Sequence, residues 1–286
     1  MSDQPSDANS KLRLTFLGTN CLCLHDGETR LLIDPFFTRP NLISLLRRIA
    51  PNPSIIQTCL ERANISRLDA VLLSHTHYDH ALDAVLTARM SGALLAGSAS
   101  AARLAAGGGL PVETCLRAED GRALSFGAFR VNFIQHAHLT LGGLGWLADG
   151  NIEKPLLPPV PAWQYRQGEV FAIHCQHPDG SLLVMGSAGE IDPRKLKNIS
   201  AKTVCLGIGG LAFKSAAYRR EYFRTVVGGC RAEQVYLTHW DTFWKRLDKK
   251  PSYLPLHRLV EWQYAKLAHR EGIRLVCLQP WQEVVL

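Results

Sequence analysis

The stretch HTHYDH, at residues 75–80, places four side chains of the metal-ligand type within six positions, directly after the apolar run AVLL at residues 70–73. Imidazole nitrogens and carboxylate oxygens suit zinc and similar first-row divalent metals. A strand end followed by one turn would deliver the first two histidines to one ion. The aspartate and the third histidine would then turn towards a neighbouring ion. This HxHxDH pattern predicts a metal centre at the mouth of a buried strand.

The residues around the motif favour a metal site over a solvated polar loop or a relic site. A motif match carries a false-positive risk until its structural context agrees with it. Here a β-like run leads into the motif, and ALDAVLTARM at residues 81–90 predicts a following helix that Ser91-Gly92 ends. Strand, ligand-rich turn and helix therefore come in the order that a site at a sheet edge requires.

Length and composition indicate one large folded unit. A chain of 286 residues with 47% hydrophobic residues can bury a sizeable core, and no repeat or break in composition divides it. We expect a single domain over residues 12–286. Residues 1–11 are polar and lack the cationic start and apolar stretch of a secretion signal, so they predict a disordered tail. No apolar run approaches the length of a membrane-spanning helix.

The eight cysteines indicate a reducing compartment. They form no CxxC pair, and several lie in apolar strand-like runs such as TVCL at residues 203–206. Buried, reduced thiols of this kind are typical of a cytoplasmic protein. We therefore expect a cytoplasmic location.

The formal charge of +7 does not point to one kind of partner. Its basic residues fall into short separate runs, at Arg47-Arg48, 194–197 and 245–250, which are usually solvated faces. No recognised nucleic-acid-binding motif accompanies the charge, so we expect no nucleic-acid partner.

Strand-like and helical segments occur in two sets along the chain. Strands are expected at residues 12–18, 21–24, 30–34, 70–73, 93–97, 123–135 (a hairpin), 170–175, 181–185, 203–207, 234–238 and 274–279, with helices near 98–106, 218–227 and 255–271. Two sets of strands flanked by helices imply an α/β fold, a four-layer αββα sandwich. The irregular stretch 142–168 resembles an active-site wall or lid.

Several short matches support a family resemblance that covers residues 12–286. They are Leu17-Gly18-Thr19, the segment LIDP at residues 32–35, the HxHxDH motif, a histidine at a strand end, a turn centred on Gly186, and His239-Trp240-Asp241. With them the chain resembles the metallo-β-lactamase-fold hydrolases, most closely the branch of the ascorbate-6-phosphate lactonases and N-acylphosphatidylethanolamine phospholipases. HxHxDH is the specific part of this resemblance, and the other matches support it.

The resemblance implies two neighbouring metal sites, filled by one or two zinc ions, with manganese or iron as alternatives. The implied ligands are His75, His77 and a third histidine for one ion, and Asp79, His80 and His239 for the other. For the third histidine we favour His138 over His136, because the segment QHAH at 135–138 loosely resembles the Pro-Ala-x-His form of the phospholipases. His136 then either supports the ligands or is a plain strand residue.

Ser187 departs from the family pattern. Most relatives have Gly-Asp-Thr where this chain has Gly186-Ser187-Ala188, and that aspartate normally bridges the two metals. A neutral hydroxyl removes one negative charge, so the second metal should bind more weakly. Three outcomes follow: two ions bridged by hydroxide, one ion in the three-histidine site, or an inactive relic. Glu190 lies close in sequence as a weaker substitute for the bridge.

The expected activity is that of a metal-dependent hydrolase. A dication lowers the pKa of its bound water from ~15.7 to around 7, and that hydroxide would attack an ester, lactone, amide or phosphodiester. Asp79 would orient the nucleophile, accept its proton or bind metal. Asp34 would hold an imidazole in place, while Trp240 and Asp241 would orient ligands or line the pocket, unless they are ordinary loop residues.

The substrate class stays open between a small molecule and a lipid. Residues 41–50 have amphipathic character that could touch lipid, although a helix packed on the core is the commoner explanation. Two other functions also remain: a mononuclear iron dioxygenase of the same fold, and a non-catalytic metal-binding or regulatory protein. Oxygen uptake with iron would distinguish the first, and low metal retention the second.

Overall fold

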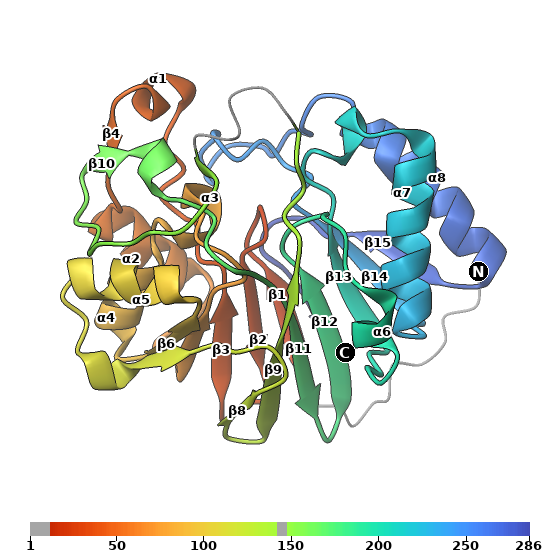
Figure 1. Cartoon of the computed structure of the whole chain (residues 1–286), viewed down its shortest axis with the longest axis horizontal. Helices are drawn as coiled ribbons and strands as arrows, with labels where there is room; N and C mark the ends of the chain where they lie inside the picture. The colour runs from red at the N-terminus through yellow and green to blue at the C-terminus, as the bar shows by residue number, and fades with distance from the viewer. Residues whose placement is uncertain (1–11, 142–147) are drawn as a thin grey trace.

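The apolar runs of the chain form two mixed β-sheets that pack face to face between helices (Figure 1). This computed structural model describes residues 12–141 and 148–286. The expectation of a disordered tail falls on residues outside these ranges, as does the start of the stretch expected to form an active-site wall. The α/β four-layer sandwich predicted from the order of elements is confirmed.

The first sheet has seven strands, and its central strands run parallel after an antiparallel start. In spatial order these strands are β16 (Gln282–Val285), β1 (Arg13–Phe16), β2 (Leu22–His25), β3 (Arg30–Ile33), β5 (Ala70–Leu72), β6 (Leu94–Gly97) and β7 (Cys115–Arg117). Because β3 and β5 are parallel neighbours, the residues that follow them emerge at the same edge of the sheet.

The second sheet also has seven strands, with an antiparallel half and a parallel half. In spatial order they are β15 (Arg274–Cys277), β14 (Gln234–Thr238), β13 (Thr203–Gly207), β12 (Gly180–Met185), β11 (Val170–His177), β9 (Phe129–His136) and β8 (Ala123–Phe126). A separate two-stranded pair joins β4 (Arg48–Ile49) to β10 (Val160–Pro161).

Helices cover the outer face of each sheet (Figure 1). On the side of the first sheet lie α2 (Pro53–Arg62), α4 (Ala84–Ser91) and α5 (Ala99–Gly107), and on the other side α6 (Pro193–Leu196), α7 (Ala216–Phe223) and α8 (His257–Glu271). Two short helices complete this side: α1 (Leu42–Leu45) lies at the top of the view in Figure 1, and α3 (Tyr78–Ala81) lies lower, nearer the strands. None of the helices in the described ranges is long and apolar enough to cross a membrane.

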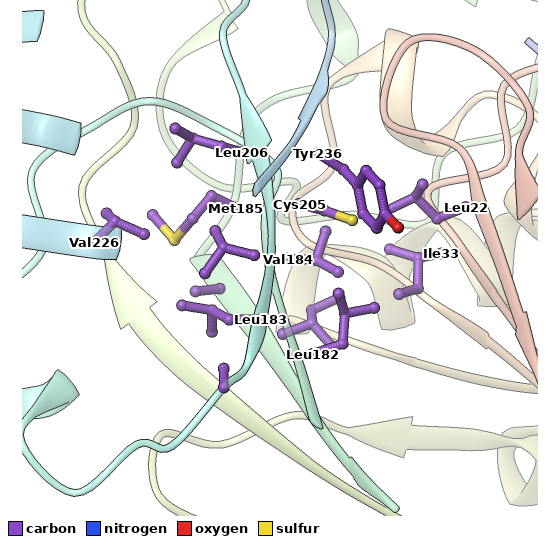
Figure 2. Packing of buried hydrophobic residues seen from close by; sticks show 14 of the residues in the cluster. Leu22, Ile33, Leu182, Leu183, Val184, Met185, Cys205, Leu206, Val226 and Tyr236 are labelled. Carbon is purple, nitrogen blue, oxygen red and sulfur yellow. The ribbon is translucent and has the colours of Figure 1, made fainter. Parts of the chain in front are cut away.

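Strand β12 shows how one strand supplies two layers of the core. Its side chains alternate, so that Leu182 and Val184 lie on the side of Leu22 and Ile33 from the first sheet (Figure 2). Leu183 and Met185 point the other way, towards Val226 in the helical layer (Figure 2). Burying a side chain of this size contributes roughly 1.5–3 kcal/mol, and this two-sided burial fixes the sandwich.

The helix expected over residues 81–90 is wrong in its boundaries. Helix α3 already begins at Tyr78, and α4 begins at Ala84 after a break at Leu82-Asp83. The Asp83 carboxylate accepts hydrogen bonds from the backbone N–H of Phe37 (2.6 Å) and of Thr38 (2.7 Å), and from the Thr38 hydroxyl (2.5 Å). The break between α3 and α4 thus coincides with the contact of Asp83 with Phe37 and Thr38. The local sequence does not reveal this tertiary contact.

The amphipathic segment at residues 41–50 packs on the core only through Leu45 and Ile49, so the commoner explanation of a helix packed on the core holds only in part. Helix α1 covers four residues and buries none of them. Leu42, Ile43 and Leu46 are 55%, 69% and 83% exposed. Strands β7 and β16 also lie outside the expected set of strands, because each is short and lies at an edge of the first sheet.

Replacing Asp83 tests how much its buried bonds stabilise the fold. We expect Asp83→Ala to lower the free energy of unfolding by about 2–4 kcal/mol, because it leaves buried N–H groups without an acceptor. Urea denaturation measures this change. The matched control is Glu153→Ala at an exposed position, which should change stability by less than about 0.5 kcal/mol. Equal effects for the two variants would contradict the prediction.

Candidate metal centre

A buried carboxylate organises the sheet edge where the HxHxDH motif emerges. Asp34 follows β3, is fully buried and has a positive φ of 46°. Its oxygens accept hydrogen bonds from Ser74 N (2.7 Å) and Ser74 Oγ (2.5 Å), and from Asn20 Nδ2 (2.8 Å). One oxygen also lies 2.8 Å from His80 Nδ1. Asp34 thus fixes both the start and the end of the motif.

The glycine-centred turn after β12 closes against this network. A Cβ atom at Gly186 would collide with Ser74 Oγ and would lie 3.2 Å from Asp34 Oδ2. Only glycine therefore lets β12 approach the Asp34 carboxylate this closely. The second sheet is brought against the motif at this point.

Three histidines from the two sheets form the first donor group. His75, His77 and His138 each offer a ring nitrogen, and these atoms lie within 4.8 Å of one another. The ring centroid of His138 is 4.9 Å from that of His75 and 4.5 Å from that of His77. The geometry thus groups His138, which follows β9, with the two motif histidines.

His136 lies outside this group. It is the last residue of β9, and neither ring nitrogen has a hydrogen-bond partner among the described residues. Burial lowers the pKa of His136 to about 4. The structure therefore gives His136 no visible contact with the donor group, which matches the alternative of a plain strand residue.

Asp79, His80 and His239 form the second donor group, and their donor atoms also lie within 4.8 Å of one another. Asp79 Oδ2 is 3.2 Å from His239 Nε2 and 3.7 Å from His80 Nε2. His239 follows β14 in a left-handed conformation, with φ of 56°, and its backbone N–H donates to Thr19 O at 2.5 Å. The Leu17-Gly18-Thr19 turn therefore positions His239 from the first sheet.

Burial and charge prepare these groups to hold a cation. Burial, helped by His77 and His80, lowers the pKa of His138 to about 3. Burial and the neighbouring histidines also hold the pKa of His75 well below its usual value. Burial opposes ionisation of Asp79, but the charges of His80 and His239 lower the pKa of this carboxyl. The neutral imidazoles of His75 and His138 and the ionised carboxylate of Asp79 are thus in the forms that bind metal. His80 differs: although its burial acts the other way, Asp79 and Asp34 raise its pKa, so it would release its proton when a metal binds.

The donor atoms fit a divalent metal. The buried His75 Nε2 has no hydrogen-bond partner among the described residues, although buried polar atoms are normally paired. With Nδ1 of the same ring 3.1 Å from Ser74 Oγ, this nitrogen is left over for another partner. Five imidazoles and one carboxylate suit zinc or a similar first-row metal. Asp34 and Ser74 supply the outer hydrogen bonds that such ligands need.

Ser187, where the resemblance implies a bridging aspartate, adds no charge to the donor groups. Its hydroxyl accepts a hydrogen bond from the backbone N–H of Leu139 at 3.0 Å, and the residue is 6% exposed. Glu190, the suggested substitute, is exposed and belongs to neither donor group. Asp79 is therefore the single carboxylate in the two groups of the described residues.

Trp240 does not form a pocket wall, which corrects one sequence-based expectation. It is 1% exposed, packs against Tyr253, and donates its indole N–H to Leu278 O at 3.0 Å. Such a side chain belongs to the core and offers a substrate no surface.

Asp241 makes no hydrogen bond with a proposed metal ligand in the described part of the chain, and it supports the site through Thr19 and Arg39. Its carboxylate accepts a hydrogen bond from Thr19 N (2.8 Å) and pairs with Arg39 (2.7 Å). Arg39 in turn donates to Thr19 Oγ1 at 2.9 Å. The pair therefore holds the turn whose carbonyl accepts from His239.

Sequence reasoning predicted Asp34 as a residue that holds a ligand in place, but it missed Asn20 and Arg39. Asn20 donates to Asp34 and accepts from Thr238 Oγ1 at 2.9 Å, which links the two sheets. Arg39 is 4% exposed and paired with Asp241, yet it lies in an irregular loop. A single sequence gives no pattern for such contacts, apart from the position of Asn20 directly after the recognised Leu17-Gly18-Thr19 turn.

Removing the Asp34 carboxylate should weaken metal binding without touching a predicted ligand. We expect Asp34→Ala to lower zinc affinity about 10–100-fold, because His80 loses the partner that orients it. Titration of zinc against a competing chelator measures this affinity. Asp69→Ala is the control, because Asp69 bonds to Arg30 and Arg67 away from the donor groups. An affinity unchanged in Asp34→Ala would contradict the role given to this residue.

Comparisons with known proteins agree with this architecture. A UPF0173 metal-dependent hydrolase of Heliobacterium modesticaldum is 31% identical over 140 residues, which are 49% of this chain and 52% of that protein. Other UPF0173 relatives match over smaller shares, so the chain spans about half or less of the length of the curated relatives it matches.

Solved structures share the fold at low sequence identity. A metallo hydrolase from the archaeon Ignicoccus hospitalis has a TM-score of 0.61 at 15% identity, over 96% of this chain and 97% of that one. CmlA, a diiron beta-hydroxylase from Streptomyces venezuelae, has a TM-score of 0.61 at 16% identity, over 99% of this chain and 55% of that one. The family model described as a beta-lactamase superfamily domain matches residues 13–239, which is most of the chain. The chain therefore belongs to the beta-lactamase superfamily.

Proposed function

We propose that the protein is a metal-dependent hydrolase that acts on an ester, lactone, amide or phosphodiester. The observation that carries this proposal is the pair of adjacent donor groups at one sheet edge, three histidines in one and Asp79, His80 and His239 in the other. The UPF0173 relatives, which carry the name metal-dependent hydrolase, support it.

His75, His77 and His138 would hold one ion, and Asp79, His80 and His239 the other. A dication held there supplies an acidified water at neutral pH and a Lewis acid for the substrate oxygen. We assign zinc as the metal on the donor set, with manganese or iron as alternatives. Ser74 and Asp34 keep the rings of His75 and His80 in fixed orientations through their hydrogen bonds.

We assign Asp79 to orient the attacking water, to accept its proton or to bind metal. Its Oδ2 atom lies 3.2 Å from His239 Nε2 and 3.7 Å from His80 Nε2. The lowered pKa of Asp79 keeps it ionised at neutral pH. An ionised carboxylate accepts hydrogen bonds, so it would orient a water held beside it.

The substrate is proposed to be a small molecule or a lipid. In the segment 41–50, the side chains of Leu42, Ile43 and Leu46 are exposed, next to the exposed Arg47 and Arg48. A surface that is both apolar and basic could contact a lipid, so we retain a lipid as a proposed substrate. Liposome binding together with phospholipid cleavage would favour the lipid, and cleavage restricted to soluble esters or lactones would favour the small molecule.

Ser187→Asp tests how the missing carboxylate sets the number of bound metals. We expect the added negative charge to raise the affinity for the second ion and bring the metal content closer to two per chain. Elemental analysis of protein purified without chelator measures this content for zinc, manganese and iron. Ser187→Asn has similar size without the charge and should leave the content as in the wild type. A metal content that does not change in Ser187→Asp would contradict the prediction.

Hydrolysis of a panel of aryl esters, lactones and phosphodiesters tests the proposed activity. We expect turnover that a chelator removes and that His77→Ala lowers by about 100-fold or more, because the first donor group loses one of its three nitrogens. His269→Ala, in an exposed histidine of α8, is the control and should keep full activity. Oxygen uptake by the iron-loaded protein without hydrolysis, or function that survives His77→Ala, would overturn the proposal.

A further inference from the structure

A cavity of about 350 Å³ lies beside the metal centre. Its lining includes Arg39, Arg62, Lys245, Lys249, Lys250 and Trp281. None of the six proposed metal ligands lines it. Arg39 and Asp241 form part of its wall, so the buried pair that holds the Thr19 turn separates this cavity from His239.

The cavity wall carries uncompensated positive charge. Its two acids are already paired, Asp241 with Arg39 at 2.7 Å and Asp248 with Arg246 at 2.9 Å. The remaining cations of the wall have no carboxylate partner within the described residues; they are Arg62, Lys245, Lys249 and Lys250. Four like charges around one cavity favour an anionic occupant.

The folded chain gathers this charge from distant segments. The run at residues 245–250 by itself would be a solvated face. The structure adds Arg62, the last residue of α2, and Trp281, which precedes β16. The Arg62 guanidinium stacks on the Trp281 ring, 4.1 Å from its centroid. This contact holds one cation in place at the cavity wall, where a freely solvated side chain would move.

Two buried donors in the same wall also lack acceptors. Arg39 Nε and Trp281 Nε1 are buried and have no hydrogen-bond partner among the described residues. Both are N–H groups that can donate and cannot accept. Unpaired buried donors add positive potential to a wall that is already cationic.

We propose that this cavity binds a phosphate group of a ligand, at a site separate from the metal centre. Phosphate offers several acceptor oxygens and up to two negative charges, which suits a stacked guanidinium surrounded by lysines. The phosphate could belong to a soluble monoester or to a lipid headgroup, since both present the same chemistry. The inference does not depend on the proposed hydrolase activity.

Isothermal titration of the full-length protein with inorganic phosphate and with glycerol 3-phosphate tests the site. We expect binding that Arg62→Gln combined with Lys245→Gln weakens by roughly tenfold or more for each cation removed. Lys197→Gln combined with Lys202→Gln removes two exposed lysines elsewhere and is the matched control, which should bind as the wild type does. Thermal unfolding of each variant shows that the fold is retained.

Two results would overturn the proposal. One is the absence of phosphate binding in the wild type at low salt. The other is binding that survives Arg62→Gln with Lys245→Gln and disappears in His77→Ala, which would assign the phosphate to the metal centre.

Sedimentation with phosphatidylcholine vesicles that contain phosphatidic acid identifies the source of the phosphate. Vesicle binding that is lost in the double cavity variant, with weak binding of glycerol 3-phosphate, would support a lipid headgroup. Tight binding of glycerol 3-phosphate without vesicle binding would support a soluble monoester. Vesicle binding that the double cavity variant leaves unchanged would place lipid contact outside this cavity and count against a lipid source.

Discussion

The rest of the site depends on the hydrogen bonds that the buried carboxylate of Asp34 makes. Asp34 is fully buried, and it joins Asn20 to Ser74 and His80, which lie at the two ends of the HxHxDH segment. A buried charge is costly unless its partners are complete, so removing any of these partners leaves an uncompensated group. The positive φ of Asp34 and the absence of a side chain at Gly186 both follow from the need to bring these segments together.

The donor groups combine burial with very little negative charge. Five imidazoles surround the single carboxylate of Asp79, and Ser187 adds only a hydroxyl that already accepts from Leu139 N. Burial keeps His75 and His138 neutral by lowering their pKa values, which prepares them as ligands. Only Asp79 therefore supplies negative charge to offset a second dication. A carboxylate at position 187 would have added another negative charge.

Much of the fold could be predicted from the sequence, because apolar periodicity and the HxHxDH motif are local signals. The four-layer sandwich and most strands, such as Thr203–Gly207, follow from these patterns. The break before Asp83 and the exposure of α1 could not be predicted, because both depend on tertiary contacts or on their absence. The motif identified four of the six donor residues, and the family resemblance implied the other two, His138 and His239. The Asn20–Thr238 link and the Arg39–Asp241 pair have no sequence pattern.

A crystal structure of the zinc-loaded protein, with anomalous data collected at the zinc edge, would show whether both donor groups bind metal. We expect one anomalous peak among His75, His77 and His138, and a second, weaker peak among Asp79, His80 and His239. The second peak should be weaker because the residue at position 187 is neutral. A peak at any other place, or no zinc bound to either group, would show that these residues do not form the metal centre.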